Sequence, residues 1–214
     1  MRTSHLAPLL AVLCWLSWLL PQPAQAQTKI LFVGDSLTEG YGVAKEASYP
    51  TLVEATLKER GYKDVIAVNA GVSGATTASG VSRLKWHLNG NPKPKIMLLA
   101  LGANDGLRGL DLKASRKNLV DVIKLGKQHG MQVLLAGMKM PPNYGVDYTT
   151  KFAAMFEEIA KEEDVPLLPF LLEGVAADSK LNLADGIHPN PDGYKIVAAT
   201  VVKYLEPLLA KEKK

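Results

Sequence analysis

The chain of 214 residues contains a single cysteine, so it has no partner with which to form an intramolecular disulfide. Aromatic residues make up only 7%, and no arginine- and lysine-rich cluster interleaved with aromatic side chains is present. A disulfide-framed scaffold is therefore excluded, and a nucleic-acid partner is not expected. Only 21% of the residues are charged, with a formal net charge of +4, while 47% are hydrophobic. This composition excludes a disordered chain and favours an enzyme-sized globular domain.

The chain also lacks a hydrophobic run long enough to cross a membrane. Its longest run, residues 6–20, is shorter than the roughly 20 residues that a transmembrane helix needs, and two prolines follow it. The small residues at the first and third positions of Ala24-Gln25-Ala26 are typical of a signal-peptide cleavage site. A lipid-modified Cys14 is not favoured, because a leucine rather than a small residue precedes it. We therefore predict a signal peptide over residues 1–26, a single domain over 27–214, export to the periplasm or the medium, and no stable membrane insertion after cleavage.

Short apolar runs of strand length alternate with longer segments of helical spacing. Continuous apolar runs rich in Val, Ile and Leu are typical of parallel strands that are covered on both faces. The five runs are Ile30–Val33, Val65–Val68, Ile96–Leu101, Val133–Ala136 and Val165–Leu168. Helical spacing follows each of them, around residues 52–57, 81–88, 112–125, 152–159 and 196–205. The alternation predicts an α/β protein, a three-layer α/β/α sandwich, with ligands at the carboxyl ends of the strands.

Polar residues beside glycines follow four of the predicted strands. Ser36 lies in the first of these loops. A serine at this position commonly caps a helix, and the more specific alternative is that it acts as a nucleophile. The Gly-x-Ser-x-Gly elbow of the α/β-hydrolases is absent, because position 38 is Thr. The Gly-Lys-Ser/Thr ending of a phosphate-binding loop is missing as well.

Three histidines follow the predicted signal peptide, and His188 is the one placed to act as a base. His87 and His129 lie at predicted helix ends, where a cationic side chain is mildly favoured. His188 lies in a predicted rim loop, three residues after Asp185, which is close enough to orient an imidazole. Because histidine titrates near neutral pH, activity should rise as the base loses its proton. A local turn and a metal site are the alternatives, and no second His or Cys ligand pair supports the metal.

Two further loops offer hydrogen-bond donors for an oxyanion. Asn104 lies between two glycines after the third run, where it serves either a left-handed turn or an oxyanion. Gly74, after the second run, offers its N–H and permits close approach of the backbone. Asp35 and Asp105 suggest a glycosidase pair, but each neighbours a stronger candidate, so we assign them structural hydrogen bonds.

The order of these residues resembles the four blocks of the SGNH (GDSL) hydrolase superfamily, which carry Ser, Gly, Asn and His. The matching positions are Ser36 in Gly-Asp-Ser-Leu, Gly74, Asn104, and His188 in Asp-x-x-His. The closer likeness is to its exported branch with acyl-CoA thioesterase, arylesterase and lysophospholipase activity. That likeness is carried by segments 104–109, 142–145, 165–170 and 185–190. One departure is Ala103, where many members have Gly.

The resemblance implies a flavodoxin-like sheet of five parallel strands. It implies Ser36 as nucleophile, His188 as base and then acid, and Asp185 as its orienting partner. The oxyanion hole would consist of the Ser36 and Gly74 N–H groups and the Asn104 side chain. No cofactor or metal is required by the acyl-enzyme mechanism that this family uses.

Substrate-binding residues are expected in two further segments of the same rim. Leu107, Arg108, Pro142 and Tyr144 are predicted to border the pocket for an ester or thioester, and we expect a monomer. The apolar surface of Met138 and Met140 serves either that pocket or the core. The alternatives are a carbohydrate O-deacetylase on the same scaffold and a non-catalytic protein that binds lipid or an anion.

Overall fold

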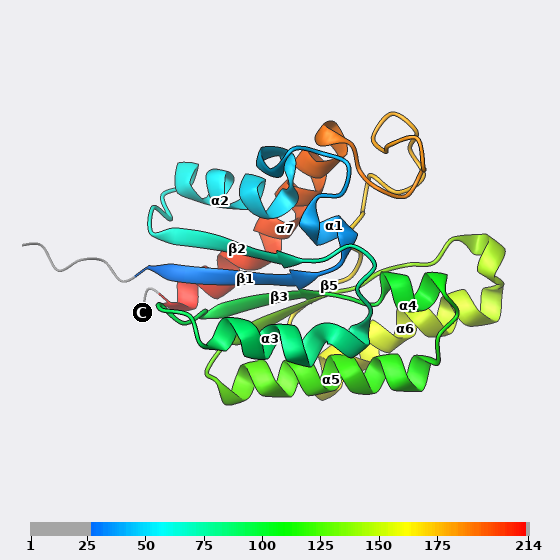
Figure 1. Cartoon of the computed structure of the whole chain (residues 1–214), viewed down its shortest axis with the longest axis horizontal. Helices are drawn as coiled ribbons and strands as arrows, with labels where there is room; N and C mark the ends of the chain where they lie inside the picture. Colours follow the sequence, from blue (N-terminus) through cyan, green and yellow to red (C-terminus); the bar gives the residue numbers. More distant parts are fainter. Residues whose placement is uncertain (1–26, 213–214) are drawn as a thin grey trace, which may run out of the picture.

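The computed structural model describes residues 27–212, which form a five-stranded parallel sheet between two layers of helices (Figure 1). The signal peptide predicted over residues 1–26 lies outside the described residues. The strand order is β2-β1-β3-β4-β5, and all four neighbouring pairs are parallel, which confirms the predicted fold class. The strands are β1 Thr28–Gly34, β2 Val65–Gly71, β3 Ile96–Ala100, β4 Gln132–Ala136 and β5 Leu167–Leu168.

The longer helices cover the two faces of this sheet. Helices α2 and α7 pack against each other on one face, and α3, α5 and α6 cover the other (Figure 1). Residues 30–33 and 96–99 in the central strands have no exposed surface, which explains why their sequences read as unbroken apolar runs. No helix within residues 27–212 has the length and apolar character needed to span a bilayer. The helices are α2 Tyr49–Glu59, α3 Gly80–Leu88, α5 Leu112–Gln128, α6 Val146–Glu162 and α7 Pro191–Glu212.

The last strand is shorter than its sequence predicted. The apolar run begins at Val165, but the strand begins at Leu167. Pro166 has no N–H to donate to the ladder, and the N–H of Val165 instead donates to the carbonyl of Ala160 at the end of α6. The prediction that Val165 belongs to the strand was therefore wrong.

Two short helices that the sequence did not predict lie at the carboxyl edge of the sheet. Helix α1, Ser36–Glu39, follows β1, and helix α4, Ala103–Leu107, follows β3. Each is too short to show a hydrophobic period. Single 3₁₀ turns complete the loops, η2 Lys45–Ala47, η3 Thr77–Ser79 and η4 Pro142–Tyr144.

Two glycines allow α1 to lie directly on the ends of β1 and β2. A Cβ atom on Gly34 would lie 1.9 Å from Thr38 Oγ1, and one on Gly71 would lie 2.1 Å from the Glu39 backbone nitrogen. Any side chain at either position would push the helix away from the sheet. The glycines therefore determine where Ser36, the first residue of α1, is held.

Candidate active site

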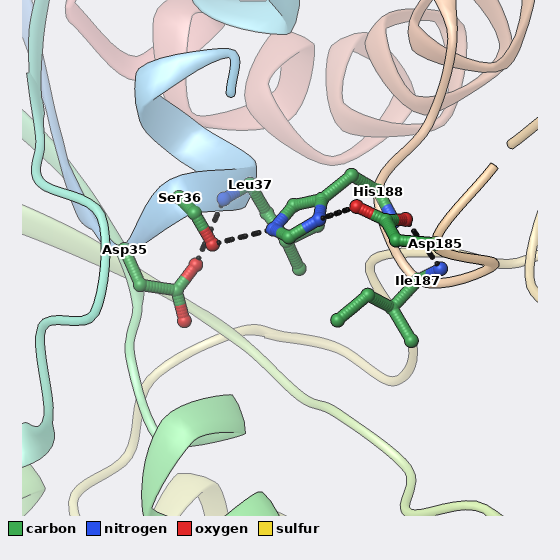
Figure 2. A network of polar contacts seen from close by, with 6 residues as sticks. All are labelled: Asp35, Ser36, Leu37, Asp185, Ile187 and His188. Atoms are coloured by element: carbon green, nitrogen blue, oxygen red, sulfur yellow. Dashed lines mark hydrogen bonds and ion pairs between the residues drawn. The ribbon is translucent and has the colours of Figure 1, made fainter. Parts of the chain in front are cut away.

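Ser36 and His188 are 152 positions apart in the sequence, and their side chains are within hydrogen-bond distance (Figure 2). Ser36 Oγ lies 2.9 Å from His188 Nε2, and His188 Nδ1 lies 2.7 Å from Asp185 Oδ2. The serine comes from the turn after β1, and the other two residues come from the loop between β5 and α7. The structure thus brings together the three residues that the sequence singled out as nucleophile, base and orienting acid.

The ionisation of Asp185 decides which ring nitrogen of His188 carries the proton. Burial opposes ionisation of this carboxyl group, but hydrogen bonds from the backbone of Ile187 and His188 and from the imidazole outweigh it and lower the pKa of Asp185. A carboxylate only accepts hydrogen bonds, so Nδ1 must donate to it. In the neutral imidazole Nε2 is then left to accept the proton of the Ser36 hydroxyl.

Asp35, rather than Ser36, caps helix α1. Its Oδ1 accepts a hydrogen bond from the Leu37 N–H at 3.0 Å, so the Ser36 hydroxyl is not used as a cap. Asp35 is 1% exposed, and this burial raises the pKa of its carboxyl to about 6. Its second oxygen, Oδ2, has no hydrogen-bond partner among the described residues. The neighbour of Ser36 is therefore a buried acid with one oxygen engaged and one unpaired.

The donors expected for an oxyanion lie beside the serine, in the wall of the same cavity. Gly74 has a φ of 74°, a conformation that favours glycine, and it lines the cavity together with Asn104 and Ser36. Asn104 Nδ2 donates one hydrogen bond, to the carbonyl of Ala75 at 3.0 Å. A side-chain amide has two N–H groups, so Asn104 retains a second donor for a substrate oxygen.

Asp105 holds the two donor loops together. This carboxylate is 2% exposed and accepts hydrogen bonds from Thr77 N at 2.9 Å, Thr77 Oγ1 at 2.6 Å and Ser115 Oγ at 3.0 Å. It therefore links α4, which carries Asn104, to the turn that follows Gly74 and to α5. The hydrogen bonds assigned to Asp35 and Asp105 from the sequence are both present.

The cavity beside Ser36 has a volume of about 610 Å³. Leu107 and Pro142 line it, as predicted, whereas Arg108 and Tyr144 are not among the lining residues. Tyr144 supports the wall from outside, because its hydroxyl donates to the carbonyl of Leu107 at 3.1 Å, and Arg108 donates to the carbonyl of Gly74. The other apolar lining side chains include Leu37, Met138, Met140, Pro141, Phe170, Leu172 and Ile187.

The sequence profile of the GDSL-like lipase/acylhydrolase family matches residues 32–196, which is most of the chain. The chain belongs to this family. Among curated proteins, this hydrolase is 39% identical over 186 residues to an arylesterase of Vibrio mimicus, covering 85% of this chain and 92% of that protein. It is 38% identical over 191 residues to esterase TesA of Pseudomonas aeruginosa, covering 89% and 94%. It is 37% identical over 186 residues to thioesterase 1/protease 1/lysophospholipase L1 of Escherichia coli, covering 87% of each.

Solved structures of similar proteins share the fold over nearly the same residues. A crystal structure of TesA superposes on this hydrolase with a TM-score of 0.81 at 36% identity, covering 85% of this chain and 99% of that one. AlinE4, described as an SGNH-hydrolase family esterase, gives a TM-score of 0.72 at 37% identity, covering 88% and 97%. The fold and the family assignment therefore agree, and the chain is an enzyme of the SGNH type.

Tyr41 and Lys139 are among the cavity residues of this hydrolase that the sequence did not point to. The ring of Tyr41 packs on the His188 imidazole with centroids 4.6 Å apart, although the tyrosine is half exposed. Lys139 lines the cavity from the loop after β4. Tyr41 lies between two glycines in a rim loop, a signal that was available in the sequence. The lysine gave no signal, because exposed lysines are ordinary surface residues.

His87 and His129 do not line the cavity. His87 is in the last turn of α3, and His129 follows the last residue of α5. Burial, together with the nearby charges of Arg83 and Lys29, lowers the pKa of His87, so its position at a helix end does not make it a stable cation. Within residues 27–212, no cluster of three or more His, Cys, Asp or Glu side chains is arranged to hold a metal.

Proposed function

We propose that this hydrolase cleaves carboxylic esters and thioesters through an acyl-enzyme on Ser36. The observation that carries the proposal is the 2.9 Å contact between Ser36 Oγ and His188 Nε2 beside a cavity of about 610 Å³. A serine hydroxyl is a weak nucleophile unless an adjacent base removes its proton, and this contact supplies that base.

In the acylation step, His188 Nε2 accepts the proton of Ser36 Oγ as this oxygen attacks the carbonyl carbon. The oxyanion that forms receives hydrogen bonds from the N–H groups of Ser36 and Gly74 and from the free amide N–H of Asn104. Asp185 stabilises the imidazolium, which then donates its proton to the departing alcohol or thiol.

In the deacylation step, the same groups act on water. His188 removes a proton from a water molecule that attacks the acyl carbonyl, and then returns the proton to Ser36 Oγ as the acid is released. Every proton in this cycle moves between Ser36, His188, substrate and water, so the mechanism requires no cofactor or metal.

The cavity wall favours a longer acyl chain or an aryl group over the small acetyl group. Leu107 and Pro142, with the methionines and Phe170 beside them, offer apolar surface well beyond the reacting carbonyl. The names of the relatives, arylesterase and thioesterase 1/lysophospholipase L1, are consistent with substrates of this kind. A carbohydrate O-deacetylase would instead lose activity as the acyl chain lengthens.

The direct test compares Ser36→Ala with the wild-type enzyme on p-nitrophenyl esters and acyl-CoA thioesters of graded chain length. We expect Ser36→Ala to lose kcat by roughly 10⁴-fold or more on every substrate, because the variant removes the hydroxyl that is hydrogen-bonded to His188 Nε2. Ser82→Ala, which removes an exposed hydroxyl on α3, is the matched control and should retain full activity. Turnover that persists in Ser36→Ala would exclude this nucleophile, and a preference for acetyl esters would favour the deacetylase.

We also infer that residues 1–26 direct export and are removed, which leaves residues 27–214 as the active enzyme in the periplasm or the medium. The short apolar run and the Ala24-Gln25-Ala26 triplet support this inference. Sequencing of the exported protein should find Gln27 at its N-terminus. An intact Met1 on the cell-associated protein would contradict it.

A further inference from the structure

Lys139 is the one lysine or arginine among the residues that line the cavity. It follows β4 in the chain and lies between Met138 and Met140, which are 7% and 8% exposed and also line the cavity. The two buried methionines hold the backbone in place, while the Lys139 side chain is exposed to solvent. The Lys139 side chain therefore borders the cavity and is open to solvent.

The Lys139 ammonium is held by an aromatic ring instead of by a carboxylate. Its Nζ lies 5.0 Å from the centroid of the Phe170 ring, a cation–π distance. Within residues 27–212, no ion pair or hydrogen bond engages this ammonium. Lys58, Lys117 and Lys151, by contrast, each pair with an acid on their own helix. The N–H donors of the Lys139 ammonium are thus available to an anion that enters the cavity.

Arg108, the other cation of this rim, is not placed in the same way. Its guanidinium donates to the carbonyl of Gly74 at 3.1 Å and is not among the lining groups. Lys139 is therefore the cation of the cavity wall that is available to an anionic group near the reacting carbonyl.

The strand order sets the spacing between the starts of the loops that carry Lys139 and Ser36. The loop that carries Lys139 follows β4, and β3 lies between β4 and β1, which leads to Ser36. Adjacent strands are spaced by about 4.8 Å, so the two loops begin roughly 10 Å apart. The Lys139 side chain, which rests on Phe170 in the loop after β5, is long and flexible enough to turn towards Ser36 and span much of that distance. The favoured anion therefore lies a few bonds from the ester, and not at the end of a long arm.

We propose that Lys139 forms an anion subsite that takes the phosphate of a single-chain glycerophospholipid whose ester is at Ser36. The glycerol backbone of such a lipid separates ester and phosphate by a short link, whereas the pantetheine arm of an acyl-CoA keeps its phosphates distant from the thioester. The proposal rests on the proposed hydrolysis at Ser36 and adds a specificity residue to it. No bond is made or broken at Lys139.

The test uses two substrates with the same acyl chain, a lysophosphatidylglycerol and the corresponding monoacylglycerol, below their critical micelle concentrations. Lys139→Met keeps the length of the side chain and removes its charge. We expect KM for the lysophospholipid to rise about tenfold, with kcat and the monoacylglycerol constants within twofold of the wild type. Lys139→Arg should restore most of the affinity. Lys151→Met, which removes an exposed lysine on α6 outside the cavity wall, is the matched control.

A binding measurement separates this subsite from the chemistry at Ser36. The 1-alkyl ether analogue of the lysophospholipid has no ester to cleave, so calorimetric titration reports the phosphate contact even if the proposed hydrolysis is wrong. Lys139→Met should weaken its binding about tenfold. Equal losses on the lysophospholipid and the monoacylglycerol would overturn the proposal in favour of a packing role on Phe170. An equal loss on acyl-CoA would overturn the assignment to the glycerol-linked phosphate.

Discussion

The cavity has two walls that differ in chemistry and in how they are held. The polar wall, formed by Ser36, Gly74, Asn104 and His188, comes from the loops after β1, β2 and β3 and the loop before α7. The apolar wall comes mainly from the loops after β4 and β5 and includes Met138, Met140, Pro141, Pro142 and Phe170.

The buried carboxylate of Asp105 cross-links the loops of the polar wall, and within residues 27–212 no buried carboxylate does the same for the apolar wall. Asp35 caps α1 beneath Ser36, and Asp105 connects the loops of Gly74 and Asn104. In the apolar wall, the Leu107 carbonyl accepts one hydrogen bond from the hydroxyl of Tyr144, whose ring is only partly buried. Groups that act on charge need fixed positions, whereas groups that contact an acyl chain need only a suitable shape and surface.

Helix α4 carries one residue of each wall, Asn104 and Leu107, and therefore offers a direct test of this difference. Asn104→Ala removes an oxyanion donor, so kcat should fall by roughly 10²–10³-fold and by the same factor for acetyl and octanoyl esters. Steady-state kinetics on the two p-nitrophenyl esters measures this. A loss confined to one chain length would show that Asn104 acts on binding and not on the oxyanion.

The buried Asp35 carboxyl should make the stability of the fold depend on pH. In the folded protein burial raises the pKa of Asp35 from 3.8 to about 6, so the folded state binds its proton more tightly than the unfolded chain does. The contribution of this group to stability is therefore full below about pH 3.8 and is lost as the pH rises to 6, by roughly 3 kcal/mol. Asp35→Asn should gain that amount relative to the wild type between pH 4 and pH 7, measured by urea unfolding.

Asp105→Asn is the matched variant for that measurement. It leaves at least one of the three donors of Thr77 and Ser115 without an acceptor, so it should lower the free energy of unfolding by about 1–3 kcal/mol at pH 7. If Asp35→Asn and Asp105→Asn change stability by the same amount and sign at pH 7, the distinction between the two acids is wrong.

The smallest expected effect belongs to the apolar wall. Leu107→Ala removes apolar surface from the cavity, so the ratio of kcat/KM for octanoyl over acetyl esters should fall about tenfold. The constants for the acetyl ester should stay within twofold of the wild type, since a short acyl group does not reach this surface. A uniform loss on both esters would place Leu107 among the residues that position α4.

The sequence predicted the strands and helices that are long enough to show a hydrophobic pattern. It did not predict features that depend on contacts between residues far apart in the chain or on a single proline. Buried runs such as residues 96–101 predicted the strands, and the spacing of Asp185 and His188 predicted their pairing. Helices α1 and α4 are too short to show a period, and Pro166 shortened β5 through its missing N–H. Lys139 was missed because its meaning depends on Phe170, which lies 31 positions later in the chain and only meets it in the fold.

The central claim is that the Ser36 hydroxyl is the group that attacks the substrate. Reaction with a fluorophosphonate, followed by peptide mass spectrometry, tests it most directly. We expect a single phosphonylated peptide, with the adduct on Ser36, and loss of labelling in both Ser36→Ala and His188→Ala. An adduct on another serine, or full labelling of Ser36→Ala, would contradict it.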